Sequence, residues 1–134
     1  MKILITGSSG YIGSCCYEYF KKKFDTYGLD KDKPKINYQK KFYKCNLLNH
    51  KKLDEFIKQL KPEVIIHLAG QSTVDFIKNK KNYIQNNNLA TKNLINSIKK
   101  NKIPNLIFSS TAAVYKSSER SIKENSLIKP NNIY

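Results

Sequence analysis

Short runs of apolar residues alternate with longer amphipathic stretches along most of this chain. The apolar runs predict strands over residues 2–6, 26–30, 38–47, 63–70 and 105–111, of which 38–47 is the weakest, with its centre at 41–45. Apolar positions that recur with helical spacing predict helices over residues 11–24, 49–61 and 82–101. Residues 31–37 are predicted to form a polar loop, and residues 116–133 are polar and irregular.

Each predicted helix carries one apolar face that should pack against a sheet. In the first helix this face consists of Ile12, Cys15, Cys16, Tyr19 and Phe20. In the second it consists of Leu53, Phe56, Ile57 and Leu60, and Asn49 is the expected N-cap. In the third it consists of Ile84, Leu94, Ile95 and Ile98.

The alternation of strands and helices predicts a parallel sheet, because each helix then forms the crossover between two strands. Right-handed crossovers give the strand order 3-2-1-4-5. We therefore expect an α/β fold of the Rossmann type, with a doubly wound parallel sheet. The length suits one domain, so residues 1–134 form a single predicted unit. No segment approaches the length of an apolar membrane span, and we expect no membrane partner.

A glycine-rich turn joins the first predicted strand to the first helix. Gly7, Gly10 and Gly13 follow the spacing Gly-x-x-Gly-x-x-Gly. In this context such glycines allow a tight turn, close approach of the backbone to a pyrophosphate and close helix–strand packing. Asp30 ends the second strand, where a carboxylate can bind an adenosine ribose and repel a 2′-phosphate. The pattern predicts a dinucleotide site that favours NAD over NADP; a ligand-free glycine turn with a solvated aspartate is the alternative.

The formal net charge of +15 is, taken alone, typical of nucleic-acid binding. However, Arg120 is the one arginine, and the lysines are spread over the predicted helices and loops without a nucleic-acid motif. We interpret the charge as solvated surface and expect no nucleic-acid partner. A steeply salt-dependent affinity for DNA would contradict this interpretation.

The cysteines and histidines do not form a metal-binding pattern. Cys15, Cys16 and Cys45 have neither metal-ligand spacing nor a paired framework, and we expect reduced core thiols in a cytoplasmic protein. His67 lies in an apolar run and is predicted to pack in the core, whereas His50 is predicted to lie on the surface at a helix start. No metal site is expected.

Several stretches together resemble one enzyme family. They are TGSSGYIGS (6–14), LD (29–30), VIIHLAG (64–70), NNNLATKNLI (86–95), FSSTAAVY (108–115) and ENSLIKPNNIY (124–134). Their order and spacing are similar to those of the extended short-chain dehydrogenases/reductases. Within these, the likeness is to the NAD-dependent nucleotide-sugar epimerases and dehydratases, most of all to UDP-glucose 4-epimerases. The resemblance implies NAD as the cofactor, a nucleotide sugar such as a UDP-sugar as the substrate, and a homodimer for full-length members.

The resemblance also implies roles for individual residues. The expected cofactor-binding residues are Gly7, Gly10, Tyr11, Ile12 and Gly13 at the pyrophosphate, Asp30 at the adenosine ribose, Asn46 and Leu47 at the adenine, and Leu68, Ala69, Gly70 and Asn87 along the turn after the fourth strand. The family usually has Asp in the place of Asn46. Thr111 and Tyr134 match the catalytic Ser/Thr and the tyrosine of the motif Tyr-x-x-x-Lys. The lysine of that motif falls beyond the last residue given.

Ala112 and Ala113 bear on the type of reaction. Dehydratases of the family carry Asp-Glu directly after the catalytic threonine, and alanine cannot transfer a proton. We therefore expect an epimerase, in which Tyr134 removes a proton from a sugar hydroxyl while a hydride passes to NAD and back. The alternatives are a dehydratase, which residues 69–75 resemble, another enzyme of the family such as a reductase or decarboxylase, or a non-catalytic NAD-binding module.

Members of the family are long enough to include a second domain for the sugar nucleotide. We therefore expect residues 1–134 to be a truncated, N-terminal NAD-binding domain without the substrate domain. Alone, this chain is expected to bind NAD weakly, if at all, and not to turn over. Measurable epimerase activity of the 134-residue chain would contradict this expectation.

Overall fold

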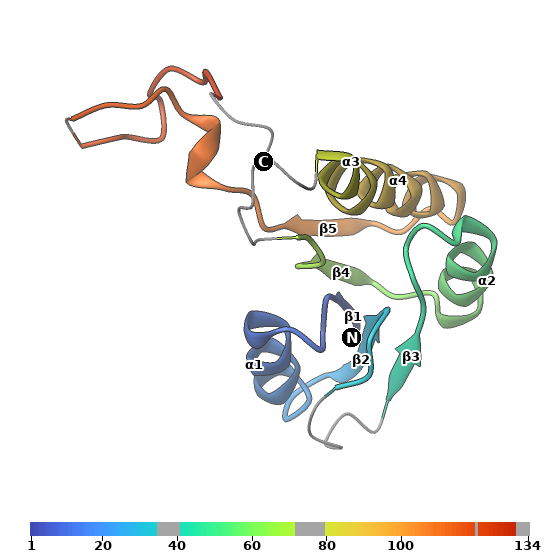
Figure 1. The fold of residues 1–134 in the computed structure, drawn as a ribbon. Coiled ribbons are helices and arrows are strands. Elements are labelled where there is room, and N and C mark those ends of the chain that lie inside the picture. The colour runs from blue at the N-terminus through green and yellow to red at the C-terminus, as the bar shows by residue number, and fades with distance from the viewer. Residues whose placement is uncertain (35–40, 72–79, 120, 131–134) are drawn as a thin grey trace.

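The computed structural model describes residues 1–34, 41–71, 80–119 and 121–130. Within them one sheet is formed by β1 (Lys2–Thr6), β2 (Asp25–Asp30), β3 (Phe42–Lys44), β4 (Val64–His67) and β5 (Asn105–Phe108). All neighbouring strands are parallel and their order is β3-β2-β1-β4-β5 (Figure 1). The predicted Rossmann-type topology is confirmed.

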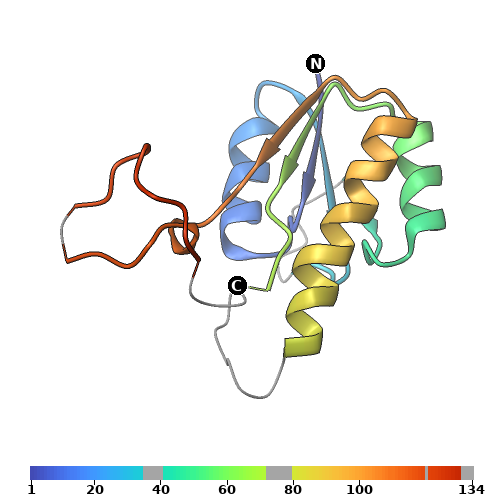
Figure 2. The ribbon, with the colours of Figure 1, turned by 90° about the horizontal axis from the view of Figure 1, so that it is seen from above.

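Helices cover both faces of the sheet. α1 (Tyr11–Phe20) lies on one face, whereas α2 (His50–Leu60) and α4 (Ala90–Lys100) pack together on the other (Figure 2). α4 continues a single turn, α3 (Lys80–Tyr83), and a π-helical stretch, η1 (Ile84–Leu89). The predicted cap of α2 is confirmed, because the side chain of Asn49 accepts a hydrogen bond from the Lys52 amide at 3.2 Å.

The alternation of side chains along the strands produces two separate cores. Ile3, Ile5 and Ile66 face α1 and pack with Tyr17. The intervening strand positions, which include Leu4, Leu29 and Ile65, face the other way. They pack with the inner sides of α2 and α4, which contribute Leu53, Ile57, Leu94 and Ile98. His67 is 1% exposed at the end of β4, as predicted, and His50 is exposed at the start of α2.

The inner face of α1 differs from the prediction. Ile12 and Tyr19 are 60% and 61% exposed and Cys15 is exposed, so these three residues do not lie in the core. The buried side is set by Gly13, because a Cβ there would lie 2.0 Å from the Gly7 carbonyl oxygen. Only a glycine can approach the turn after β1 this closely, and this turns Tyr17, four residues on, toward the sheet. The helix also ends at Phe20, short of the predicted residue 24.

The third predicted helix is interrupted by η1. Leu94 and Ile98 are buried as expected, but Ile84 is 49% exposed and Ile95 is 36% exposed. The wider turn of a π-helix shifts the phase of the residues before it, so Ile84 no longer shares the face of Leu94. Ile95 lies at the rim, next to the buried stripe. Apolar spacing across 82–101 could not reveal this shift.

β5 is an exposed edge strand. Leu106, Ile107 and Phe108 are 38%, 56% and 52% exposed. β4 and β5 also end earlier than predicted, at His67 and Phe108, so the residues after them are free to form loops at the carboxyl edge of the sheet. From β5 the chain continues through η2 (Ala112–Val114) into an arm that projects from the body of the molecule (Figures 1 and 2). In this arm Tyr115 forms an antiparallel bridge with Ile128.

Candidate functional site

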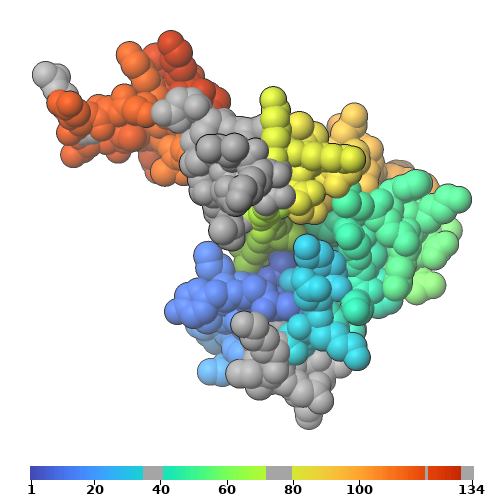
Figure 3. Space-filling model, in the orientation of Figure 1, coloured from blue at the N-terminus to red at the C-terminus, as the bar shows by residue number. Residues whose placement is uncertain are grey.

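Two neighbouring cavities open at the carboxyl ends of the strands. The first, of about 270 Å³, has a lining that includes Gly7, Gly10, Leu29, Asp30, Asn46, Leu47 and Leu68–Gly70. The second, of about 540 Å³, has a lining that includes Gly7, Gly10–Gly13, Leu68–Gly70, Asn87, Phe108 and Thr111. Because they share the glycine turn and the turn after β4, they form one elongated cleft. In Figure 3 the surface is hollowed where the blue, cyan and olive segments meet.

The glycine turn occupies the centre of this cleft. Gly7 has φ +73°, a left-handed conformation that favours glycine, and a Cβ there would lie 2.6 Å from the Ala69 nitrogen. The Gly10 amide donates to the Gly7 carbonyl oxygen at 3.1 Å, which closes the turn. Gly10 is the N-cap of α1 and offers no side chain to cap it. The first-turn N–H groups of α1 and the positive end of its dipole therefore face the cleft, an arrangement suited to a pyrophosphate.

Asp30 links the end of β2 to the glycine turn. One of its carboxylate oxygens accepts a hydrogen bond from the Ser9 amide at 3.0 Å, and the other accepts one from the Asp32 amide at 3.2 Å. The Ser9 hydroxyl donates to the Asp32 carbonyl oxygen at 2.7 Å. Each carboxylate oxygen has two lone pairs, so both can still accept a hydrogen bond from a ribose hydroxyl.

The segment after β3 forms one end of the first cavity. Leu47 is 6% exposed, and the side-chain oxygen of Asn46 accepts a hydrogen bond from the Leu48 amide at 2.9 Å. Cys45 also lines this cavity, and burial raises the pKa of its thiol above the usual range. The thiol is therefore protonated at neutral pH, and this end of the cleft carries no charged side chain from the segment.

The turn after β4 is held from below by His67. Its Nδ1 lies 2.6 Å from the Thr6 hydroxyl and its Nε2 lies 2.9 Å from the Thr91 hydroxyl. Burial lowers the pKa of His67 from 6.5 to about 4, so the ring is neutral at neutral pH. The imidazole thus connects β1, β4 and α4 directly beneath Leu68–Gly70.

The same turn is held from the side by amide groups of η1. The side chain of Asn87 accepts from the Gln71 amide at 2.6 Å and donates to the Gln71 carbonyl oxygen at 3.1 Å. Asn86 donates to the Gln71 side-chain oxygen at 3.0 Å. The side chain of Asn87, expected to contact the cofactor, therefore fixes the backbone that lines the cleft.

Thr111 is half-buried and lines the second cavity with Phe108, Ser109 and Ser110. Its hydroxyl oxygen accepts a hydrogen bond from the Ala113 amide at 3.1 Å and caps η2, which leaves the hydroxyl hydrogen free to donate. Tyr134 lies outside the described residues. The structure thus brings together the sequence-predicted residues of the cleft, from Gly7 to Thr111, and does not place the predicted base beside them.

Several residues of the site were missed by the sequence analysis. Thr6 and Thr91 are separated by 85 positions, and nothing in their sequence context marks them as partners of one histidine. The contacts of Gln71 and Asn86 depend on the π-helical turn, for which the sequence gives no signal. Within the described ranges no three His, Cys, Asp or Glu side chains cluster as a metal site would require. The same part of the chain contains no helix long and apolar enough to cross a membrane.

Comparison with known proteins shows the family and supports the fold. The model of the NAD dependent epimerase/dehydratase family matches residues 3–134. The chain belongs to this family. Its cofactor is NAD, which confirms the expectation from the glycine turn and Asp30.

Relatives within the family include epimerases and a dehydratase. A UDP-glucose 4-epimerase of Mycoplasma genitalium is 34% identical over 85% of this chain and 37% of its own length. A dTDP-D-glucose 4,6-dehydratase of Dictyostelium discoideum is 33% identical over 99% of this chain and 37% of its own. The solved UDP-Glc/GlcNAc 4-epimerase of Campylobacter jejuni superimposes with a TM-score of 0.89 at 29% identity, covering 99% of this chain and 44% of that one. The chain thus spans about two fifths of the length of these relatives.

Proposed function

We propose that residues 1–134 form the NAD-binding domain of a nucleotide-sugar 4-epimerase that acts on a UDP-sugar. The observation that carries the proposal is the elongated cleft over the glycine turn, whose dimensions and donors suit a dinucleotide. A Cβ at Gly7 or Gly13 would collide with backbone atoms, so the turn has the close packing that a pyrophosphate site requires. The names of the epimerase relatives support the choice of reaction and of UDP-sugars.

The residues of the cleft would divide the binding of NAD between them. The N–H groups of Tyr11 and Ile12 at the start of α1 are suited to the pyrophosphate. Asp30 is suited to the adenosine ribose, and its charge disfavours the 2′-phosphate of NADP. The first cavity, with Leu47 in its lining, would take the adenine, and the second, with Thr111 in its lining, would take the nicotinamide and the sugar.

The cofactor supplies a hydride acceptor and donor, which allows a sugar carbon to be oxidised and reduced again. The chain supplies the proton chemistry. Thr111 would donate a hydrogen bond to the reacting hydroxyl and orient it, and Tyr134 would take the proton of that hydroxyl. A phenol has a pKa near 10 in water and needs a neighbouring cation to act as a base at neutral pH. A lysine four residues after Tyr134 would be that cation.

Ala112 and Ala113 favour an epimerase over a dehydratase. Loss of water from a sugar needs a general acid and a general base beside the reacting carbons. The backbone of both alanines forms η2, directly after Thr111, and methyl groups can serve neither role. The 33% identity to a dehydratase keeps that reaction as the alternative outcome of an assay.

The residue encoded four positions after Tyr134 tests the catalytic proposal. Lysine at that position is expected, and another residue would contradict proton abstraction and favour a non-catalytic NAD-binding module. A longer polypeptide that includes both that lysine and a domain for the sugar nucleotide should interconvert UDP-glucose and UDP-galactose. Formation of a 4-keto-6-deoxy sugar nucleotide instead would contradict the epimerase assignment.

A further inference from the structure

A buried chain of three hydrogen-bonded side chains lies behind the cleft. The Thr6 hydroxyl is 2.6 Å from Nδ1 of His67, and Nε2 of the same ring is 2.9 Å from the Thr91 hydroxyl. Thr6 and His67 are 0% and 1% exposed, so water does not compete for the contact between them. Thr91 lines the second cavity. The chain of contacts therefore runs from the end of β1, through the end of β4, to the first turn of α4.

The burial of Thr6 decides which ring nitrogen of His67 carries the proton. Among the described residues, the Thr6 hydroxyl contacts no acceptor other than Nδ1. A buried donor that is left without an acceptor costs its full desolvation penalty. The Thr6 hydroxyl therefore donates to Nδ1, which must be the unprotonated nitrogen. Because burial lowers the pKa of His67 to about 4, the ring is neutral and its one proton lies on Nε2, which donates to Thr91.

The opposite tautomer would leave a group of the chain unsatisfied. With the proton on Nδ1, the ring would donate to the Thr6 oxygen, and the hydrogen of that hydroxyl would have no acceptor. This cost falls on a residue that is fully buried, whereas Thr91, at the other end, is half-buried. The environment of His67 thus selects the tautomer that is protonated on Nε2.

Each member of this chain lies next to a segment that lines the cleft. Thr6 directly precedes the glycine turn, and His67 directly precedes the turn after β4. Thr91 follows Asn87 by one helical turn, and the side chain of Asn87 binds the backbone after β4. A shift of the His67 ring would therefore change the relative placement of the two turns and the start of α4.

We infer that His67 is a positioning residue of the proposed NAD site. As a ring that is protonated on Nε2 alone, it holds the three segments that line the cleft in one arrangement before any ligand is present. A site whose groups are already in place loses less free energy to ordering when it binds. The role toward NAD rests on the proposed function, whereas the arrangement itself is a property of the ligand-free chain.

The first measurement determines the tautomer in the ligand-free 134-residue chain. The nitrogen chemical shifts of a histidine ring distinguish a protonated from an unprotonated nitrogen. At neutral pH we expect His67 to be protonated on Nε2 and unprotonated on Nδ1. His50, the other histidine of the chain, is exposed and should show shifts averaged over both tautomers. A proton on Nδ1 of His67, or averaged shifts such as those of His50, would overturn the inference.

The second measurement is hydrogen exchange of two amides that hold the turn after β4. The Leu68 amide donates to the Thr6 carbonyl oxygen at 3.1 Å, and the Gln71 amide donates to the Asn87 side chain at 2.6 Å. Thr91→Val removes the acceptor of the Nε2–H group, so the protection of both amides should fall about tenfold. Thr91→Ser keeps the hydroxyl and should retain the protection within about threefold.

Ser97→Ala is the matched control. Ser97 is a buried residue of the same helix, and its hydroxyl donates to Asp54 at 3.0 Å. It lies outside the linings of both cavities. Opening of the turn after β4 does not break the contact with Asp54, so this variant should leave the protection of both turn amides within about twofold of wild type.

Equal protection of the turn amides in Thr91→Val and wild type would overturn the inference. Equal losses in Thr91→Val and Ser97→Ala would also overturn it, because the effect would then be one of general stability. A longer polypeptide that fails to bind NAD would instead contradict the proposed function. That result would leave the tautomer and the exchange pattern of the ligand-free chain unchanged, so the two failures are distinguishable.

Discussion

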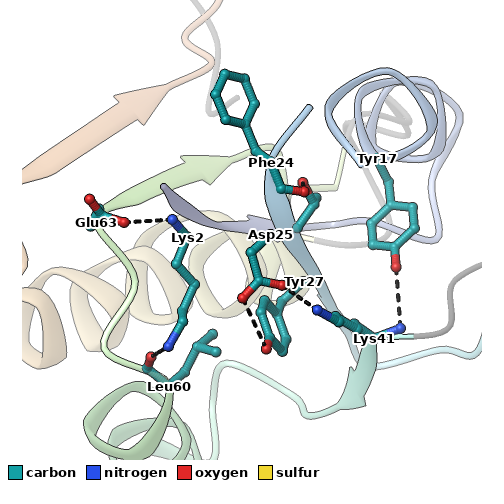
Figure 4. A network of polar contacts seen from close by, with 9 residues as sticks. Lys2, Tyr17, Phe24, Asp25, Tyr27, Lys41, Leu60 and Glu63 are labelled. Carbon is teal, nitrogen blue, oxygen red and sulfur yellow. Dashed lines mark hydrogen bonds and ion pairs between the residues drawn. The ribbon is translucent and has the colours of Figure 1, made fainter. Parts of the chain in front are cut away.

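The two ends of the sheet are built from different chemistry. At the amino end the polar groups are charged and exposed: Lys41 pairs with Asp25, and Lys2 donates from its amide to Glu63 at 2.6 Å and from its ammonium group to the Leu60 carbonyl oxygen at 2.9 Å (Figure 4). At the carboxyl end the supporting groups are neutral and buried, as in the contact of His67 with Thr6. At the amino end the charged side chains are paired with other groups of the chain. At the carboxyl end, the N–H groups at the start of α1 and the carboxylate of Asp30 face a cleft.

This difference has a consequence for mutation. Ion pairs of exposed side chains contribute little because water and salt screen them. Buried groups at the carboxyl end cannot be compensated by solvent. Changes at the carboxyl end should therefore affect both stability and ligand binding, and changes at the amino end should have small effects on stability alone.

Gly13→Ala should have the largest effect. Its Cβ would lie 2.0 Å from the Gly7 carbonyl oxygen, so α1 or the glycine turn must move. We expect a loss of about 3 kcal/mol in the free energy of unfolding, at the upper end for overpacking, and no detectable NAD binding. Gly70→Ala is the control in the same cleft, since its nearest neighbour, the Asn87 side-chain oxygen, is 3.5 Å away. Denaturant unfolding of both variants is the measurement, and equal stabilities would contradict the close packing at Gly13.

Stability should fall as the pH is lowered from about 6.5 to about 4, the range between the usual and the lowered pKa of His67. In this range the unfolded chain binds a proton that the folded chain excludes. Between pH 6.5 and about pH 4 the free energy of unfolding is expected to fall by about 3 kcal/mol in total. Below about pH 4 this residue causes no further loss. His67→Gln should show a correspondingly smaller change, measured by denaturant unfolding at several pH values. A slope identical to that of wild type would show that the ring is not buried in the neutral form.

Asp30→Asn should weaken NAD binding about tenfold, because hydrogen bonds to a charged acceptor contribute roughly 1.5–3 kcal/mol. It should also reduce the preference for NAD over NADP, since the repulsion of the 2′-phosphate is lost. Titrations of the variant with both dinucleotides measure the two effects. An unchanged preference for NAD over NADP in Asp30→Asn would show that Asp30 does not face the ribose. Asp32→Asn, in the neighbouring loop, is the control and is expected to keep the wild-type preference.

Asp25→Asn should have the smallest effect. Lys41 holds the pKa of Asp25 below 3.8, so the pair contributes at higher pH, and its contribution is lost as the pH falls through the lowered pKa. Because the pair is exposed, we expect a cost of less than about 1 kcal/mol, reduced further by salt. NAD affinity should equal that of wild type. A tenfold loss of affinity would mean that the two ends of the sheet are coupled.

The sequence could predict the sheet, its strand order and the glycine turn because each depends on local patterns. Strand β4 is a continuous apolar run, and Asn49 caps α2 by a contact over three positions. The inner face of α1 was predicted only in part: Cys16 and Phe20 pack against the core, but Ile12, Cys15 and Tyr19 do not, because close packing at Gly13 sets the rotation of the helix. The contacts of His67 and Asn87 join residues that lie far apart in the sequence, so the spacing of residues along the chain could not predict them.

The most direct test of the account is a titration of the 134-residue chain with NAD, followed by amide resonances. Saturable shifts are predicted for Gly7, Gly10 and Asp30 at the carboxyl end, even where binding is weak, and none for Lys2 or Asp25 at the amino end. Gly13→Ala should abolish the shifts. If NAD instead shifts Lys2 and Asp25 at the amino end as much as the residues of the cleft, the cleft over the glycine turn is not a dinucleotide site.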